Sequence, residues 1–171
     1  MPLKFRRTVL LAAPLSLMLW ALPAAATATA PQWHAAKVAS LPSGATGLPD
    51  GFLPALSCPS AGNCSAGGSY YDSAGNVQGL VLREVKGVWK SPSRLIPPSQ
   101  ADADPSLTIN SLSCSTAGNC VAVGSFEDTH SNGLSFVADE VKGVWKRATN
   151  MALPANAGST VQNSELHSVL C

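Results

Sequence analysis

A 56-residue internal repeat constrains this chain more than any other feature of its sequence. Residues 56–98 align without a gap to residues 112–154, and 21 of the 43 aligned positions are identical. Trp33, Trp89 and Trp145 follow the same spacing. Self-similarity at a fixed period of this size indicates a repeat architecture, in which neighbouring units bury a shared core. We therefore expect the three tryptophans to occupy one structural position.

Each repeat has the pattern of short antiparallel strands. In the second copy, residues 109–114 alternate apolar and polar side chains, and residues 121–123 and 134–141 form further strand candidates. A Lys-Gly pair at 142–143 then precedes a Val-Trp pair, which is the composition of a tight hairpin. Convincing helical periodicity is absent from positions 31–171. The pattern predicts an all-β fold with four strands in each unit.

The size of the repeat predicts the architecture. Four strands in about 56 residues are close to the size of a β-propeller blade. We predict a partial β-propeller-like array over residues 31–171, with units at about 56–111 and 112–167 and partial units at both ends. A small β-sandwich or barrel is the alternative. Closed propellers need about four to eight blades, so we expect an incomplete array.

The N-terminus is typical of an export signal. Three cations are followed by an apolar segment at residues 9–22 and by small residues that offer cleavage sites up to Ala30. An apolar segment of this length is too short to cross a bilayer comfortably. We expect a signal peptide at residues 1–30 and a secreted protein without a stable membrane anchor after its removal. Sec export is expected, and Arg6 and Arg7 leave the twin-arginine route open.

The charge balance narrows the choice of partners. The chain has 11 basic and 10 acidic residues, which gives a formal net charge of +1. Removal of the signal would take away three of the cations. Neither balance supplies the bulk electrostatic attraction that drives binding to nucleic acid or anionic lipid. We therefore expect no nucleic-acid partner.

Two pairs of cysteines recur at the same place in the repeat. Cys58 and Cys64, like Cys114 and Cys120, are separated by five residues that include an Ala-Gly-Asn turn. In an exported protein we predict a disulfide across each turn. Metal binding is the alternative, although structural zinc usually needs shorter spacings and further ligands nearby. Cys171 has no visible partner, and we interpret it as the first half of a third pair.

Several other residues could carry a function, and each also has a structural explanation. The tryptophans could stack sugar rings, but we expect them to pack between neighbouring units. Asp72 and Asp128 begin loops that end in asparagine and could offer oxygen ligands to calcium, but turn capping is the simpler explanation. His34, His130 and His167 lie at unrelated points of the repeat, and we predict that they are surface residues.

The recurring residues also support a resemblance. Residues 112–126, followed by Val-Lys-Gly-Val-Trp-Lys, resemble the Cys-paired, β-propeller-like repeats of secreted actinobacterial proteins. Residues 64–70 also resemble a kelch element, whose glycine doublet ends a strand. The resemblance covers nearly all of the mature chain. It implies a repeat architecture and supplies no catalytic residue, because propellers host many unrelated functions.

Three hypotheses follow for the function. The first is a secreted binding or interaction module on a repeat scaffold, with an extracellular glycan, peptide or cell-wall polymer as ligand and no cofactor. The second is a fragment of a longer propeller without independent function. The third is a propeller-type extracellular enzyme that acts on glycans. That enzyme would need metal ligands or paired carboxylates, which the sequence does not display, and loss of an activity on mutating Asp72 or Asp128 would support it. Nucleophile-elbow, phosphate-loop and dinucleotide motifs are absent.

Overall fold

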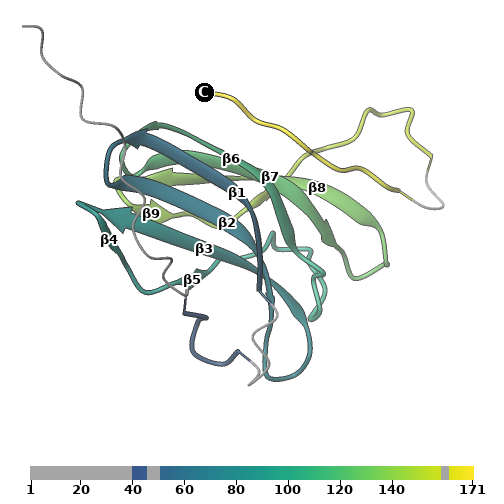
Figure 1. Cartoon of the computed structure of the whole chain (residues 1–171). Coiled ribbons are helices and arrows are strands. Elements are labelled where there is room, and N and C mark those ends of the chain that lie inside the picture. The colour runs from purple at the N-terminus through teal and green to yellow at the C-terminus, as the bar shows by residue number, and fades with distance from the viewer. Residues whose placement is uncertain (1–39, 46–50, 159–161) are drawn as a thin grey trace, which may run out of the picture. The chain divides into compact units, whose positions relative to one another are not determined.

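The fold is seen in a computed structural model of the chain, which describes residues 40–45, 51–158 and 162–171. In these residues the secondary structure is entirely β, which confirms the predicted fold class (Figure 1). The expected signal peptide at residues 1–30 lies outside the described residues. The strands are β1 (Gly51–Ser60), β2 (Asn63–Tyr71), β3 (Val77–Val85), β4 (Val88–Trp89), β5 (Ser93–Arg94), β6 (Thr108–Thr116), β7 (Asn119–Glu127), β8 (Gly133–Val141), β9 (Val144–Trp145) and β10 (Thr149–Asn150).

The strands form two antiparallel sheets, and each sheet is one copy of the repeat. Sheet 1 has the order β1-β2-β3-β4, with β5 also paired to β3. Sheet 2 has the order β10-β8-β7-β6, with β9 also paired to β8. Strands β2 to β5 recur one repeat later as β7 to β10. Neither sheet closes into a barrel, so that alternative is wrong, whereas two open sheets are consistent with a β-sandwich-like fold.

The strands predicted in the second copy are present as β6, β7, β8 and β9. Strand β7 extends well beyond residues 121–123, because its polar residues pair with β6 and β8 as regularly as its apolar ones do. The sequence pattern did not predict β10, a two-residue strand that pairs with the middle of β8. Apolar alternation therefore located the central strands but underestimated their length.

The hairpin between β8 and β9 uses the predicted Lys-Gly turn. Lys142 and Gly143 have φ angles of 52° and 80°, as a type I′ turn requires, and this turn matches the twist of a two-stranded ribbon. The turn between β6 and β7 holds this turn in place through two hydrogen bonds. Asn119 Oδ1 accepts a hydrogen bond from Lys142 N at 3.2 Å, and Gly118 O accepts one from Gly143 N at 2.8 Å. The turn at residues 86–87 repeats this geometry in sheet 1.

Both predicted disulfides are formed. Cys58 is bonded to Cys64 and Cys114 to Cys120, with Cα atoms 4.0 and 3.9 Å apart. Each bond joins the first two strands of its sheet beside the turn that connects them. Closing so short a loop restricts the unfolded chain and stabilises the fold by about 2 kcal/mol. Cys171 is a free and exposed thiol.

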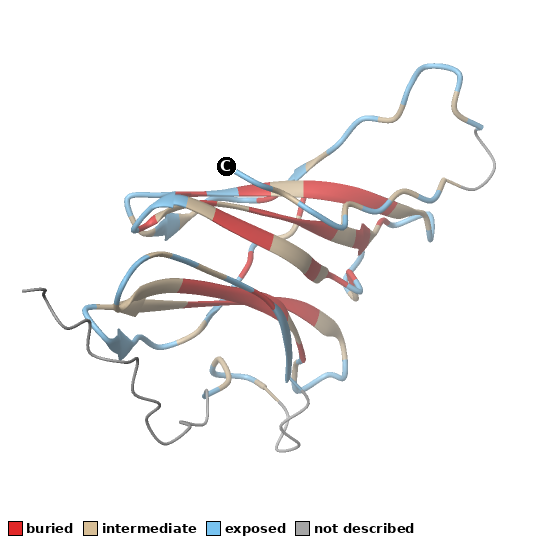
Figure 2. Cartoon of the chain, turned by 45° about the horizontal axis from the view of Figure 1, so that its top comes forward, coloured by how far each residue is buried: buried red, intermediate tan, exposed pale blue. Residues whose placement is uncertain are grey.

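The main core lies where sheet 1 packs against sheet 2. Strands β1, β2 and β3 all contact β6. Ala55 and Val81 of sheet 1 belong to the same buried cluster as Phe126 and Phe136 of sheet 2. Figure 2 shows that buried residues concentrate in the long strands of both sheets. Burial of the two phenylalanines, which are 2% and 0% exposed, supplies much of the hydrophobic stabilisation.

A second, smaller cluster covers the opposite face of sheet 1. It joins buried side chains of β2 and β3 to Leu41 and Ala45, which come from the described segment 40–45. Ala45 bridges to Asp72, and Ala101 bridges to Asp128 at the equivalent place of the second repeat. The chain segment before each sheet therefore makes the same bridge to the aspartate that follows the second strand of that sheet.

Two of the three repeated tryptophans can be compared. Trp89 pairs with Glu84 and Trp145 pairs with Glu140, so the two rings occupy equivalent positions. Trp145 is half-buried against the main core, as predicted. Trp89 is 41% exposed, so the packing prediction is wrong for this residue. The reason is that its face of sheet 1 is turned away from sheet 2. Trp33 lies outside the described residues.

Candidate functional site

Asp72 caps its loop, as the simpler interpretation predicted. It follows directly after β2, and both of its carboxylate oxygens accept hydrogen bonds of 2.9 to 3.2 Å. The hydrogen bond from the Asn76 backbone N–H is the largest cause that lowers the pKa of Asp72. The other donors add to this effect, and desolvation of the carboxylate opposes it. The donors are Ala74 N, Asn76 N, Asn76 Nδ2 and Gln78 Nε2.

Asp128 repeats this arrangement in sheet 2. Its oxygens accept hydrogen bonds from His130 N, Asn132 N and Asn132 Nδ2 at 2.8 to 3.0 Å. The Asn132 side chain is the largest cause of its lowered pKa. Groups of three or more side chains that could hold a metal ion are absent from the described residues. Both carboxylates therefore organise their own loops, and the calcium interpretation gains no support.

The two described histidines are surface residues, as predicted. The side chains of His130 and His167 are 82% and 75% exposed. His130 Nδ1 lies 3.9 Å from Asp128 Oδ2, and His167 Nε2 lies 3.6 Å from Glu165 Oε2. These contacts are local and solvated, so they are worth little. His34 lies outside the described residues.

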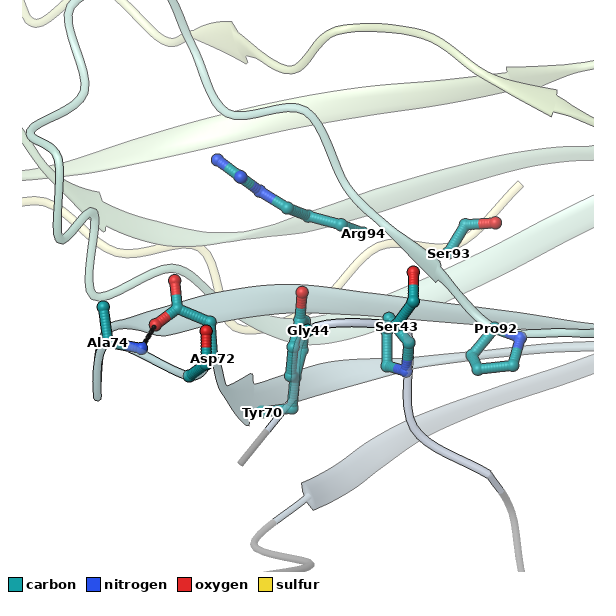
Figure 3. A pocket seen from close by; sticks show the side chains of 10 residues that line it. Ser43, Gly44, Tyr70, Asp72, Ala74, Pro92, Ser93 and Arg94 are labelled. Atoms are coloured by element: carbon teal, nitrogen blue, oxygen red, sulfur yellow. Dashed lines mark hydrogen bonds between the residues drawn. The ribbon is translucent and has the colours of Figure 1, made fainter. Parts of the chain in front are cut away.

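An open cleft of about 470 Å³ lies at one edge of sheet 1. Figure 3 shows how three segments build it. Segment 40–45 contributes Ser43, the end of β2 contributes Tyr70 with the following Asp72, and β5 contributes Arg94. The cleft brings residues from sequence positions 42 to 94 together because segment 40–45 pairs with the loop after β2.

The chemistry of the cleft is polar, with one cation. Arg94 is exposed, and Tyr70 is 4% exposed while it lines the cleft. Burial raises the pKa of the Tyr70 phenol, and the Arg94 charge opposes this effect in part. Tyr70 is therefore a neutral phenol near pH 7. Because the hydrogen bonds within its own loop occupy both oxygens of Asp72, Arg94 is the side chain through which the cleft can bind a charged group.

The corresponding place in sheet 2 has a different composition. Tyr70 corresponds to Phe126, and Arg94 corresponds to Asn150. Gln78, the cross-strand partner of Tyr70, corresponds to Leu134. The landmarks that build the fold are identical in the two copies, and Ser43 and Asp72 of the cleft recur as Ser99 and Asp128. The tyrosine hydroxyl and the cation of the cleft do not recur. Sequence reasoning overlooked Arg94, although this difference between aligned copies was the signal that could have revealed it.

A second group of polar residues lies at the junction of the two sheets. Glu140 is 2% exposed. The Ser65 hydroxyl donates to Glu140 Oε2 at 3.3 Å, and Arg83 Nη1 lies 3.6 Å from Glu140 Oε1. Burial raises the pKa of Glu140, and the Arg83 charge offsets this effect only in part. The Arg83 side chain also borders a smaller cleft of about 310 Å³, which lies between the end of β3 and the turns at residues 117–119 and 142–143. We interpret this group as a structural link between the sheets.

The chain matches no model of a known protein family and no curated protein. Any assignment of function therefore depends on the residues of the site. Within the described part of the chain, the structure contains no helix long and apolar enough to cross a membrane.

Proposed function

We propose that this chain is a secreted binding protein built on a repeat scaffold, and that the cleft beside Tyr70 and Arg94 holds its ligand. The observation that carries the proposal is the exposed Arg94 guanidinium at a cleft that hydroxyl groups also line. Sheet 2 lacks this combination although it shares the scaffold. A polar site that differs between otherwise similar units is expected where one unit has acquired a binding role.

The chemistry favours a glycan that carries carboxylate groups. A guanidinium binds a carboxylate through two parallel hydrogen bonds, and serine and tyrosine hydroxyls can pair with sugar hydroxyls. The cleft is open rather than enclosed, which suits one or two sugar units of a longer polymer. The occupied oxygens of Asp72 and Asp128 give no support to the glycan-cleaving alternative.

Export and the finer architecture are part of the same proposal. Two intramolecular disulfides fit an oxidising environment, and this supports removal of residues 1–30 as a signal during export. The two sheets follow one another as repeated antiparallel units with a common core. This arrangement supports a partial, propeller-like array with kelch-like repeats of the kind found in secreted bacterial proteins.

The proposal is tested with protein secreted by a bacterial host. N-terminal sequencing first establishes that the purified product begins near residue 31. Titration calorimetry then measures the affinity for an oligosaccharide of galacturonic acid and for its neutral galactose counterpart. We expect saturable binding of the acidic oligosaccharide. Arg94→Ala should weaken this binding by about tenfold or more, because it removes a charged hydrogen-bond donor.

Asn150→Ala is the matched control, because Asn150 occupies the Arg94 position in sheet 2. It should leave the affinity unchanged. Equal binding of the neutral and acidic sugars would contradict the carboxylate specificity. An affinity that is insensitive to Arg94→Ala would remove the cleft as the binding site.

A further inference from the structure

A cross-strand pair at the cleft is polar in sheet 1 and apolar in sheet 2. Tyr70 of β2 and Gln78 of β3 lie directly opposite one another, and the equivalent partners in sheet 2 are Phe126 and Leu134. All four side chains are buried, with exposed fractions between 2% and 5%. Because an apolar pair fills the same place in the second copy, the fold by itself does not require the tyrosine or the glutamine.

Only one end of the Gln78 amide is satisfied. Nε2 donates to Asp72 Oδ2 at 3.0 Å, and this contact fixes the amide orientation, because the reverse would place two oxygens against each other. Oε1 is buried and has no hydrogen-bond partner within the described residues. A buried acceptor in this state lowers the stability of a fold. The contact with Asp72 is therefore the interaction that could account for a glutamine at this position.

Capping of the loop does not require this contact. In sheet 1, Asp72 accepts hydrogen bonds from the backbone and side chain of its own loop and from Gln78. In sheet 2, Asp128 caps the equivalent loop with the corresponding loop donors alone, which are His130 N, Asn132 N and Asn132 Nδ2. Gln78 thus adds to Asp72 a restraint that the loop itself can do without.

Arg94 gives this extra restraint a purpose. Figure 3 shows Arg94 facing Asp72 and Tyr70 across the cleft that all three line. Burial raises the pKa of the Tyr70 phenol, the Arg94 charge lowers it and the Asp72 charge raises it further, so both charges lie near the phenol. Among the described residues Arg94 nevertheless makes no ion pair. Opposite charges in one cleft attract each other, so Asp72 competes with any acidic ligand for the guanidinium.

We propose that Gln78 is a positioning residue of the cleft, which holds Asp72 in its loop and thereby keeps Arg94 available to the ligand. The inference rests on the proposed binding role of Arg94. Nε2 of Gln78 satisfies the carboxylate oxygen that would otherwise turn toward the guanidinium. The two copies agree with this role, because the copy with Arg94 has Gln78, whereas the copy with Asn150 at that position has Leu134.

Replacement of Gln78 by the residue of sheet 2 tests the proposal. Gln78→Leu should weaken binding of the galacturonic acid oligosaccharide by about threefold, because the ligand must then break an exposed ion pair between Asp72 and Arg94. Adding Asp72→Asn removes the competing charge, keeps an acceptor for the loop N–H groups and should restore the affinity. Asp128→Asn makes the same change in sheet 2, and adding it to Gln78→Leu should restore nothing. Titration calorimetry measures all three variants.

The reactivity of Arg94 provides a second readout that needs no ligand. Phenylglyoxal modifies free guanidinium groups, and peptide mass spectrometry measures the rate at each arginine, with the exposed Arg147 as internal standard. Gln78→Leu should slow the modification of Arg94 relative to Arg147 by about threefold. Addition of Asp72→Asn should return the rate to that of the unmodified sequence.

The outcomes separate this inference from the proposed function. Failure of the protein to bind the oligosaccharide would remove the proposed function, while the reactivity of Arg94 would still decide the role of Gln78. Binding that depends on Arg94 but not on Gln78 would overturn the inference alone. It would also be overturned by losses in Gln78→Leu that Asp72→Asn does not restore, or by a lower urea midpoint for Gln78→Leu, since the fold would then require the glutamine.

Discussion

At the scale of single residues, Arg83 of sheet 1 contacts both the β8–β9 turn and the buried Glu140 of sheet 2. Its guanidinium lies near Glu140 and against the turn at Gly143. The equivalent turn in sheet 1, at Gly87, has open space around it. Both glycines have φ near 80°, a conformation that costs other residues about 1 kcal/mol or more. The two positions therefore share their backbone requirement and differ only in what surrounds them.

This difference predicts unequal effects of the same substitution. Gly87→Ala should lower the free energy of unfolding by about 1 kcal/mol, from backbone strain alone. Gly143→Ala should cost about 1 kcal/mol more, because the new methyl displaces Arg83 and leaves Glu140 with less compensation of its buried charge. Urea denaturation measures both variants. Equal losses would show that Arg83 makes no difference at the Gly143 position.

Glu140 makes stability depend on pH in an unusual direction. Its pKa is raised in the folded state, so the folded protein binds the proton more tightly than the unfolded chain does. Its contribution is fully present below the ordinary glutamate pKa and is lost as the pH rises through the folded value. Asp72 and Asp128 have lowered pKa values, so their contributions are lost only as the pH falls below the ordinary aspartate range.

We therefore expect the free energy of unfolding to decline as the pH rises above the ordinary glutamate value. Glu140→Gln should remove this decline and leave the loss at lower pH unchanged. Denaturation at a series of pH values provides the measurement, and Glu84→Gln is the control at the equivalent position of sheet 1, which is only half-buried. A decline that persists in Glu140→Gln would assign the pH effect to other groups.

At the scale of the elements, the two sheets share strands, turns and disulfides but differ in what they bury. Leu112 and Leu56 are equivalent residues of β6 and β1. Leu112 is 6% exposed because its face of sheet 2 meets sheet 1, whereas Leu56 is 62% exposed on the opposite side of sheet 1. The same asymmetry accounts for the exposure of Trp89 and the partial burial of Trp145.

These two leucines form a matched pair for mutation. Leu112→Ala should lower the free energy of unfolding by about 3 kcal/mol, through lost burial and a cavity at the junction. Leu56→Ala should change it by no more than about 0.5 kcal/mol. Calorimetric or urea unfolding of the two variants measures the difference. Similar losses would mean that Leu56 is covered in solution.

At the scale of the whole molecule, repetition explains why so much could be predicted. The all-β class, the Lys-Gly hairpins and the two disulfides depend on local sequence, on periodic apolar residues and on cysteines six positions apart. Such interactions are nearly independent of the remainder of the chain, so a repeated pattern predicts a repeated structure. The predicted turn-capping role of Asp72 and Asp128 was local in the same sense, and it is confirmed.

The cleft is a property that the packing of strands and segments creates. Arg94 reaches the cleft because β5 pairs with β3, and Ser43 reaches it because segment 40–45 crosses the loop at Asp72. Neither pairing has a signal in the local sequence.

The linear sequence by itself therefore determined the repeat, its strands, its hairpin turns and its cysteine pairs. Only the tertiary structure decided which copy of each repeated residue is buried and which polar residues meet in a cleft. The physical reason is that equivalent residues have the same local propensities but different neighbours, because the two sheets pack together through opposite faces of the repeat.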